Sequence, residues 1–292
     1  MKLIFLFAMI WAPFLNAGTG TSVEPEEAPR FFLDEPVIDE EVPAPEKIVG
    51  SFKEALPGEY EGVVFLQFRN YTSDGRSKLC TGTLIAPEVV LTAGHCIFNL
   101  SSAYSKKDYA LYPQEIAVWA GVAVSSQPAP DDPRAARIIS DGALAAKWHP
   151  AWQGGAPYDA VDMGLILLRP RAARGITAYA LNRQAPEAGT RGILAGYGST
   201  KKSKGPVKNI GFTRLRGVTE RAINIGGDSS ICSGDSGGPL FVENAGRLFV
   251  AGVASKTSFD CDTGAGAETR VDTKLEWMDS VLSGWNQSSG NK

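Results

Sequence analysis

Histidine and closely spaced cysteines are scarce in this chain of 292 residues. It contains two histidines, His95 and His149, and its four cysteines include no C-x-x-C pair. Structural zinc sites use such ligands at short spacing, so the sequence disfavours a zinc site. An excess of one charge is also lacking, because the net charge is –3. A nucleic-acid partner is therefore not expected.

Long apolar runs are missing after the first residues of the chain. The opening, MKLIFLFAMIWAPFLNAG, places Lys2 before an apolar run that Pro13 and Asn16 interrupt. Such a run is typical of a secretory signal peptide and too short for a membrane-spanning helix. We expect residues 1–17 to be this signal. The mature protein is then expected to be secreted, outside the cell or into a periplasm, with no membrane partner.

The number of cysteines fits a protein exported to an oxidising compartment. Cys80, Cys96, Cys232 and Cys261 make an even count. In an exported chain this count predicts two disulfides, and three pairings are possible for four cysteines.

Residues 18–47 differ in composition from the rest of the chain. Between residues 21 and 47 there are nine acidic side chains, two basic ones and five prolines. A segment with this composition buries too little apolar surface to offset its ordering entropy. Residues 1–47 carry a net charge of –6, which leaves a net charge of +3 for residues 48–292. We interpret residues 18–47 as an acidic propeptide in front of a mildly basic body.

The body, residues 48–292, reads as a series of short strands. Apolar runs such as GVVFLQFRN, EIAVWAGVAVS and RLFVAGVAS alternate with turn dipeptides such as Asp74-Gly75 and Gly154-Gly155. This texture predicts an all-β fold, either antiparallel barrels or a sandwich. One helix is expected at the end, where Thr273 and Glu276 form a capping-box pattern ahead of an apolar stripe.

The segment SICSGDSGGPL places Ser236 between an aspartate and two glycines. A serine becomes nucleophilic when a neighbouring base takes its proton and a third group orients that base. Two histidines are available; His95 ends a strand-like run, and His149 lies beside a proline and is expected to be structural. Gly234 lets the backbone bend, so that the N–H groups of Gly234 and Ser236 converge as an oxyanion hole.

Four motifs in order, KIVGS, LTAGHC, VDMGLILL and SGDSGGPL, resemble the trypsin/chymotrypsin family of serine peptidases over residues 48–282. The resemblance implies two packed antiparallel six-stranded β-barrels and a C-terminal α-helix. The N-terminal barrel would span about 48–165, and the C-terminal barrel with its helix about 175–285. It implies a catalytic triad of Ser236 as nucleophile, His95 as base and then acid, and Asp162 as orienting carboxylate. Asp159 is a weaker competitor, because it lies in a polar turn.

The same resemblance selects one disulfide pairing, Cys80–Cys96 and Cys232–Cys261. It also implies a zymogen. Cleavage after Lys47 by another, trypsin-like protease would free the amine of Ile48, which would then pair with the buried carboxylate of Asp235. The buried carboxylate needs such a cation, because an unpaired charge is costly to desolvate.

The resemblance assigns five residues to the substrate pocket: Ser230, Ser255, Thr257, Gly266 and Glu268. Trypsin-like members carry an aspartate where Ser230 stands, so a strong preference for Lys or Arg at P1 is not expected. Thr257 at the entrance favours small or medium apolar P1 side chains, and the open wall at Gly266 keeps an aromatic preference as the second choice. Glu268 is either neutralised inside, by Arg270 or another partner, or attracts a basic P1 residue.

The sequence therefore predicts a secreted serine endopeptidase that acts as a monomer on proteins or peptides, without metal or cofactor. The competing class is a peptidase-like binding protein that docks partners without turnover. Relatives of that kind usually lose a triad member, whereas all three candidates are present here.

Overall fold

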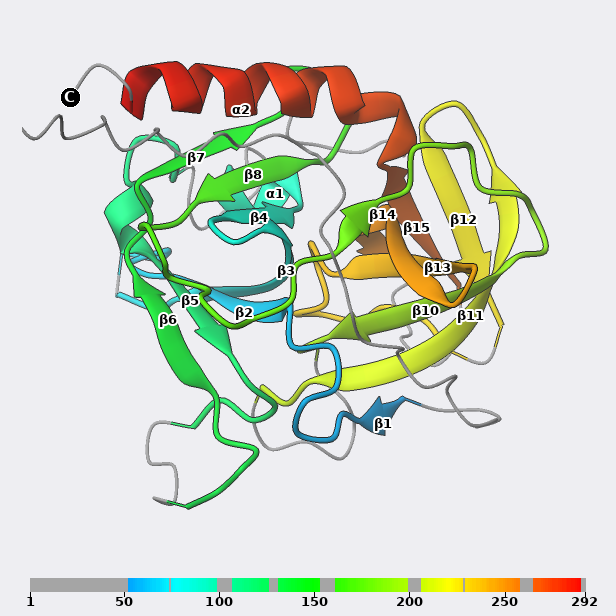
Figure 1. Cartoon of the computed structure of the whole chain (residues 1–292), viewed down its shortest axis with the longest axis horizontal. Coiled ribbons are helices and arrows are strands. Elements are labelled where there is room, and N and C mark those ends of the chain that lie inside the picture. The colour runs from blue at the N-terminus through cyan, green and yellow to red at the C-terminus, as the bar shows by residue number, and fades with distance from the viewer. Residues whose placement is uncertain are drawn as a thin grey trace, which may run out of the picture.

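The computed structural model describes residues 52–73, 75–98, 107–125, 131–152, 161–198, 206–227, 229–257 and 265–289. Its strands form two antiparallel sheets that lie side by side (Figure 1). The expected signal peptide, the propeptide and the Lys47–Ile48 bond lie outside the described residues.

The first sheet has the order β6-β5-β2-β3-β4-β8-β7. Its strands are β2 Val63–Phe68, β3 Lys78–Ala86, β4 Val89–Thr92, β5 Ile116–Ala120, β6 Arg137–Asp141, β7 Ala145–Trp148 and β8 Gly164–Leu167. The two edge strands, β6 and β7, follow one another along the chain and are separated only by residues 142–144. Gly142 breaks the strand there with a φ of +93°. The expected sixth strand is thus present as two pieces, one at each end of the sheet.

The second sheet closes on itself. Strands β10 Arg191–Gly196, β11 Asn209–Val218, β12 Ala222–Gly226, β13 Pro239–Asn244, β14 Arg247–Thr257 and β15 Ala265–Arg270 pair in a ring, because β11 contacts both β10 and β12. Two short strands are added at its margins, β1 Lys53–Glu54 against β11 and β9 Ala180–Leu181 against β14. The predicted all-β fold of two barrels is confirmed.

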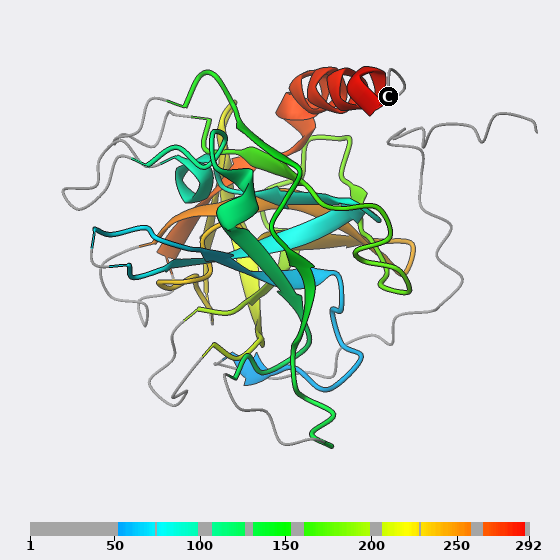
Figure 2. The same ribbon diagram turned by 90° about the vertical axis from the view of Figure 1, so that its left-hand side faces the viewer.

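Three helical elements complete the fold. They are α1 Gly94–Ile97, which follows β4, the 3₁₀ turn η1 Pro113–Glu115, and α2 Leu275–Ser289 after the 3₁₀ turn η2 Asp272–Lys274. Helix α2 lies across the outside of the sheets, near β7 and β8 (Figures 1 and 2). Its buried face consists of Met278, Val281, Leu282 and Trp285. None of the described helices is long and apolar enough to cross a membrane.

The predicted capping box at the start of this helix is wrong. Thr273 lies inside the 3₁₀ turn that leads into α2, two residues before Leu275, the first residue of the helix, and so does not occupy the N-cap position. Its hydroxyl oxygen instead accepts a hydrogen bond from Nζ of Lys274 at 2.7 Å. The apolar stripe was the reliable signal, because burial of that face, rather than the cap, holds the helix.

Candidate active site

The turn that carries His95 packs directly against Asp162. His95 lies in α1, immediately after Gly94. A side chain at Gly94 would place its Cβ 3.0 Å from the main-chain oxygen of Met163 and 3.3 Å from Oδ1 of Asp162. Glycine is therefore required for the close approach of the histidine turn to the aspartate.

Asp162 is fully buried and accepts three hydrogen bonds. Its Oδ1 lies 2.7 Å from the backbone nitrogen of His95, and its Oδ2 lies 2.6 Å from Nδ1 of the same residue. The hydroxyl of Ser255 donates to Oδ2, also at 2.6 Å. Burial alone would raise the pKa of Asp162, but the charge of His95 and these hydrogen bonds outweigh it and lower the pKa. The aspartate is held ionised, with one oxygen on the imidazole.

Ser236 lies in a loop that both barrels hold. Its main-chain oxygen accepts a hydrogen bond from the backbone nitrogen of Thr81 on β3 at 2.9 Å. Gly237, the next residue, has a φ of +85°, and a Cβ there would lie 2.0 Å from the hydroxyl of Thr92. Gly234 is also left-handed, with a φ of +99°. Within the described part of the chain, the Ser236 hydroxyl makes no hydrogen bond, to His95 or to any other group.

Sequence reasoning missed Thr81, which connects the two barrels at this point. Its buried hydroxyl donates to the main-chain oxygen of Gly234 at 2.9 Å and accepts from the backbone nitrogen of Tyr197 at 3.0 Å. The available signal was its place directly after Cys80, in a strand expected to run past the histidine turn.

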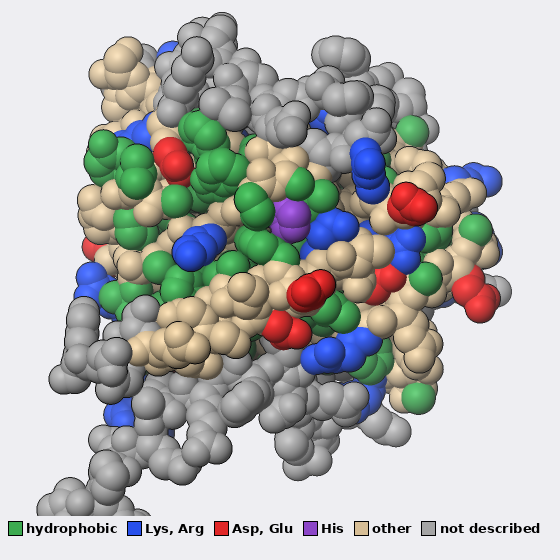
Figure 3. Space-filling model, turned by 90° about the horizontal axis from the view of Figure 1, so that it is seen from above, with side chains coloured by type: hydrophobic (Ala, Val, Ile, Leu, Met, Phe, Trp, Pro, Cys, Tyr) green, Lys and Arg blue, Asp and Glu red, His purple; other side chains and the backbone are tan. Residues whose placement is uncertain are grey.

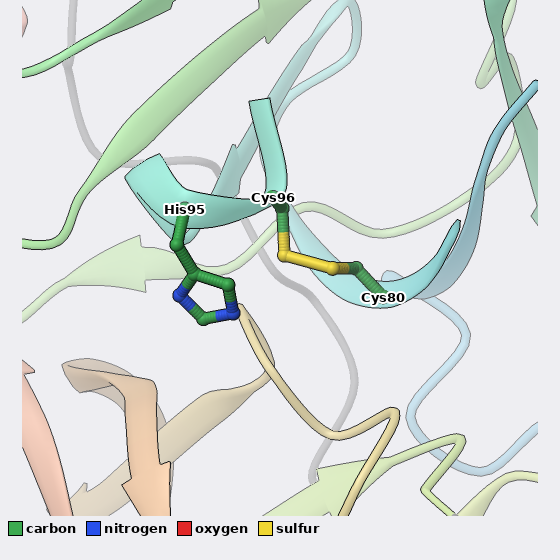
Figure 4. A group of neighbouring side chains, drawn as sticks. All are labelled: Cys80, His95 and Cys96. Carbon is green, nitrogen blue, oxygen red and sulfur yellow. A yellow bond between two sulfur atoms is a disulfide. The ribbon is translucent and has the colours of Figure 1, made fainter. Parts of the chain in front are cut away.

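A disulfide joins Cys80 of β3 to Cys96 of α1. Figure 4 shows it beside the imidazole of His95. The two sulfurs and the imidazole lie close enough together to suggest a metal-binding group. Sulfurs joined in a disulfide offer no thiolate, and Nδ1 of His95 already bonds Asp162, so this group is not a metal centre. Cys232 is also disulfide-bonded, whereas its expected partner Cys261 lies outside the described residues.

Asp235 is buried in a niche made by glycines. Its carboxylate accepts hydrogen bonds from the backbone nitrogens of Gly198 at 2.7 Å and Cys232 at 2.9 Å. A Cβ at Gly196 or at Gly198 would lie 2.2 Å from a carboxylate oxygen. Burial raises the pKa of Asp235 to about 6, although the two backbone hydrogen bonds act in the opposite direction. No described lysine or arginine forms an ion pair with it.

Four of the expected pocket residues lie on the paired strands β14 and β15, and Ser230 lies in the loop between β12 and β13. Ser230 is buried, and its hydroxyl donates to the main-chain oxygen of Ala265 at 2.9 Å. Gly266 is paired in register with Thr257 across β14 and β15. A Cβ at Gly266 would lie 3.1 Å from the side chain of Ile231, the residue after Ser230. The position of the Thr257 side chain lies outside what the structure describes.

Glu268 lacks the internal partner that the sequence suggested. It is fully buried, and neither carboxylate oxygen has a hydrogen-bond partner among the residues that the structure describes. Arg270 instead binds Asp272 through Nε and Nη2, at 3.0 and 2.5 Å, and its Nη1 donates to Thr219. The expectation that Arg270 neutralises Glu268 is therefore wrong, because a nearer carboxylate in the following turn binds the guanidinium.

His149, the second histidine, has a structural role. Its Nδ1 accepts a hydrogen bond from the backbone nitrogen of Ala151 at 3.1 Å, and its ring lies 4.9 Å from that of Trp277 on α2. Burial, with a contribution from Lys274, lowers the pKa of His149 to about 4. The imidazole is therefore neutral at ordinary pH and packs the loop after β7 against the helix.

Comparison with known proteins agrees with this arrangement. The family model described as Trypsin matches residues 49–278. The chain therefore belongs to the trypsin family. Proproteinase E of Bos taurus is 30% identical over 266 residues, which cover 82% of this chain and 96% of that protein. Phenoloxidase-activating factor 3 of Holotrichia diomphalia is 27% identical, covering 76% of this chain and 68% of that protein.

A solved structure shows the same fold. Human heparin binding protein has a TM-score of 0.58 and 22% sequence identity, covering 81% of this chain and 97% of its own. At this level of identity the likeness shows the fold alone. Membership of the family places the chain among proteins with the fold of serine endopeptidases.

Proposed function

We propose that this chain is a secreted serine endopeptidase that hydrolyses peptide bonds through Ser236, His95 and Asp162. The observation that carries the proposal is the pairing of His95 with a buried, ionised Asp162 at 2.6 Å. Ser236 follows on a loop that is hydrogen-bonded to β3, the strand whose Cys80 is tied to α1 by a disulfide. A base oriented in this way is what the activation of a serine on a bent Gly-rich loop requires for acyl transfer.

In the proposed reaction, Oγ of Ser236 attacks the carbonyl carbon of the substrate while Nε2 of His95 takes its proton. Asp162 stabilises the imidazolium, and the oxyanion is bound by the N–H groups of Gly234 and Ser236. His95 then protonates the leaving amine, which leaves an acyl group on Ser236. A water molecule, deprotonated by His95, hydrolyses this ester and restores the serine. The apo hydroxyl without a hydrogen bond fits this scheme, since catalytic contacts often tighten only with substrate bound.

We propose that the chain is made as a zymogen with a signal peptide at residues 1–17 and a propeptide at 18–47. Cleavage after Lys47 by a trypsin-like protease would free the amine of Ile48 to pair with Asp235. Two observations support the pair: Asp235 is buried without a described cation, and burial raises its pKa to about 6. A cation delivered to this niche would remove the cost of the unpaired charge.

For the P1 residue we propose small or medium apolar side chains, with aromatic ones next. Ser230 brings a hydroxyl and no charge to the pocket, and that hydroxyl already bonds Ala265. Among the relatives, a chymotrypsin-like elastase family member 3B from Macaca mulatta is 28% identical over 266 residues. Its name agrees with a preference of this kind.

The second candidate is a binding protein without turnover, as the name of the structural neighbour suggests for that molecule. A polyanion ligand such as heparin requires a surface of one sign. On the face shown in Figure 3, basic and acidic side chains are interspersed. This face does not favour a polyanion ligand, whereas the pairing of His95 with Asp162 supports the peptidase.

The test uses the full secreted chain before and after cleavage at Lys47 by a trypsin-like protease, with a library of peptides that vary at P1. We expect hydrolysis only after cleavage, mainly after apolar residues. The matched control is Ser236→Ala, cut in the same way, which we expect to be inactive. Equal hydrolysis by that variant, or none by the cut wild type, would contradict the proposal.

A further inference from the structure

Glu268 takes no part in the proposed chemistry, yet it occupies a costly position. It is 0% exposed, and within the described part of the chain both of its oxygens lack a hydrogen-bond partner. It lies beside an apolar cluster in the C-terminal barrel that includes Ile223, Ile231 and Ala254. An ionised carboxylate that is buried without partners is strongly disfavoured. Glu268 therefore has to be protonated or to bind a ligand of opposite charge.

The strand geometry places Glu268 on the same face as the pocket wall. On β15, Glu268 follows Gly266 by two residues, and side chains two apart share one face of a strand. Gly266 faces Ile231, which follows Ser230 of the expected pocket base. Across the sheet, Glu268 pairs with Ala254, the neighbour of Ser255. Glu268 therefore lies on the same face of β15 as Gly266, two residues further along the expected wall of the P1 pocket.

The groups facing Glu268 include an acid and no described cation. On β12 and β14 its register partners are Ile223 and Ala254, which do not titrate. Gly252 of β14 also faces it; a Cβ there would lie 2.8 Å from Cβ of Glu268. From the nucleophile loop, Asp235 acts on it electrostatically. Burial first, and then Asp235, raise the pKa of Glu268 well above its ordinary value.

Arg270, two residues further along the same strand, does not alter this balance. Its guanidinium is held by Asp272 and by the main-chain oxygen of Thr219. Burial without a described partner therefore favours the protonated form of Glu268 while the expected pocket is empty or holds an apolar side chain.

We propose that Glu268 is a specificity-determining acid of the P1 pocket, which releases its proton to solvent when the cationic end of a lysine or arginine side chain enters. This inference rests on the proposed peptidase function. The arriving cation supplies the partner that a buried carboxylate needs, so ionisation becomes favourable only with a basic P1 residue present. The enzyme then cleaves after apolar residues at acidic and neutral pH and gains cleavage after Lys and Arg as the pH rises.

The first experiment compares two peptides that differ only in P1, Leu or Lys, with the enzyme cut after Lys47, from pH 6 to pH 9. Because one proton is released, the Lys-to-Leu ratio of kcat/KM is expected to rise about tenfold per pH unit while Glu268 remains protonated. In Glu268→Gln the Lys-to-Leu ratio of kcat/KM is expected to stay low and flat over the same pH range. A flat ratio in the wild type, or the same rise in the Gln variant, overturns the inference.

The second experiment does not depend on catalysis. It titrates benzamidine, a cationic probe of P1 pockets, into the cut Ser236→Ala chain by calorimetry in buffers with different ionisation enthalpies. The same titration is repeated with Glu268→Gln and with Glu268→Met, each made in the Ser236→Ala chain. We expect release of close to one proton per benzamidine bound with Glu268 present, and none with Gln or Met in its place. Absence of proton release in the chain that keeps Glu268 overturns the inference, even if neither variant folds.

These two experiments separate the inference from the function on which it rests. Proton release without hydrolysis of any peptide would refute the peptidase and keep Glu268 as a ligand-sensing acid. Hydrolysis with a flat P1 ratio and no proton release would refute the role of Glu268 alone.

Discussion

Nζ of Lys78 lies 2.5 Å from the main-chain oxygen of His95, and thereby holds the histidine turn by a contact independent of Asp162. Lys78 begins β3, two residues before Cys80, which is bonded to the residue after His95. Burial lowers the pKa of Lys78 to about 8, while the nearby charge of Asp162 acts in the opposite direction. One strand thus fixes the turn twice, by a covalent bond and by a cation.

Replacing Lys78 by Met is expected to lower kcat/KM for an apolar peptide about tenfold, or ~1.4 kcal/mol in the transition state. The variant loses both the hydrogen bond to His95 and the positive charge near Asp162. Lys147→Met, at an exposed position of β7, is the matched control and is expected to keep wild-type kinetics. Unchanged kinetics in Lys78→Met would show that this contact does not position the histidine.

Gly198→Ala tests the niche around Asp235. The added Cβ would lie 2.2 Å from a carboxylate oxygen, so either the loop or the aspartate must move. We expect a loss of stability of about 2 kcal/mol or more, typical of overpacking, and little activity after cleavage. Gly284→Ala in α2 is the control, because a Cβ there meets open space. Equal thermal stability of the two variants would contradict the close packing described here.

The proposed Ile48–Asp235 pair predicts a pH-dependent difference between the uncut and cut chains, measured as unfolding free energy in the Ser236→Ala background. In the uncut chain the pKa of Asp235 is raised to about 6, above its ordinary value of 3.8. The contribution of this group to the unfolding free energy is therefore fully present below pH 4 and is lost as the pH rises through 6. At 1.4 kcal/mol per pKa unit, the loss amounts to about 3 kcal/mol.

Cleavage would supply a cation and reverse that trend, so the stability of the cut chain relative to the uncut chain is expected to increase between pH 4 and pH 7. Asp235→Asn is expected to remove the pH dependence of the difference. If the cut and uncut chains keep a constant difference across this range, Asp235 does not receive the new amine.

Glu268 predicts a second pH effect on stability, of the same sign as that of Asp235. Its raised pKa means that the folded chain holds a proton that the unfolded chain gives up. The stability is complete below the ordinary pKa of 4.5 and falls as the pH rises above it. Glu268→Gln is expected to flatten this slope in urea unfolding of the uncut chain from pH 5 to pH 8. Exposed Glu187→Gln is the control, and an equal slope in both variants would contradict the burial of an unpaired acid.

Much of the fold was predictable, because short apolar runs between turn residues report antiparallel strands directly. The turn dipeptide Asp141-Gly142 agrees with the break between β6 and β7. Thr273 does not cap the last helix, because a 3₁₀ turn that the local pattern did not reveal precedes that helix. Arg270 shows the same limit. Glu268 and Asp272 each lie two residues from Arg270 in the sequence, so spacing alone does not distinguish them, and in the folded chain Arg270 binds Asp272. At the site, the motif residues His95 and Asp162 were predictable, whereas Thr81 and Lys78 act through main-chain oxygens, which no residue type reveals.

The most direct test of the central claim is the reaction of the cut chain with a fluorophosphonate, followed by peptide mapping and the rate of labelling. We expect one phosphonyl group per chain, on Ser236. Its rate of formation is expected to fall by orders of magnitude in His95→Ala, and no labelling is expected after denaturation. Labelling spread over several serines, or an unchanged rate on Ser236 without His95, would contradict a serine made nucleophilic by this histidine.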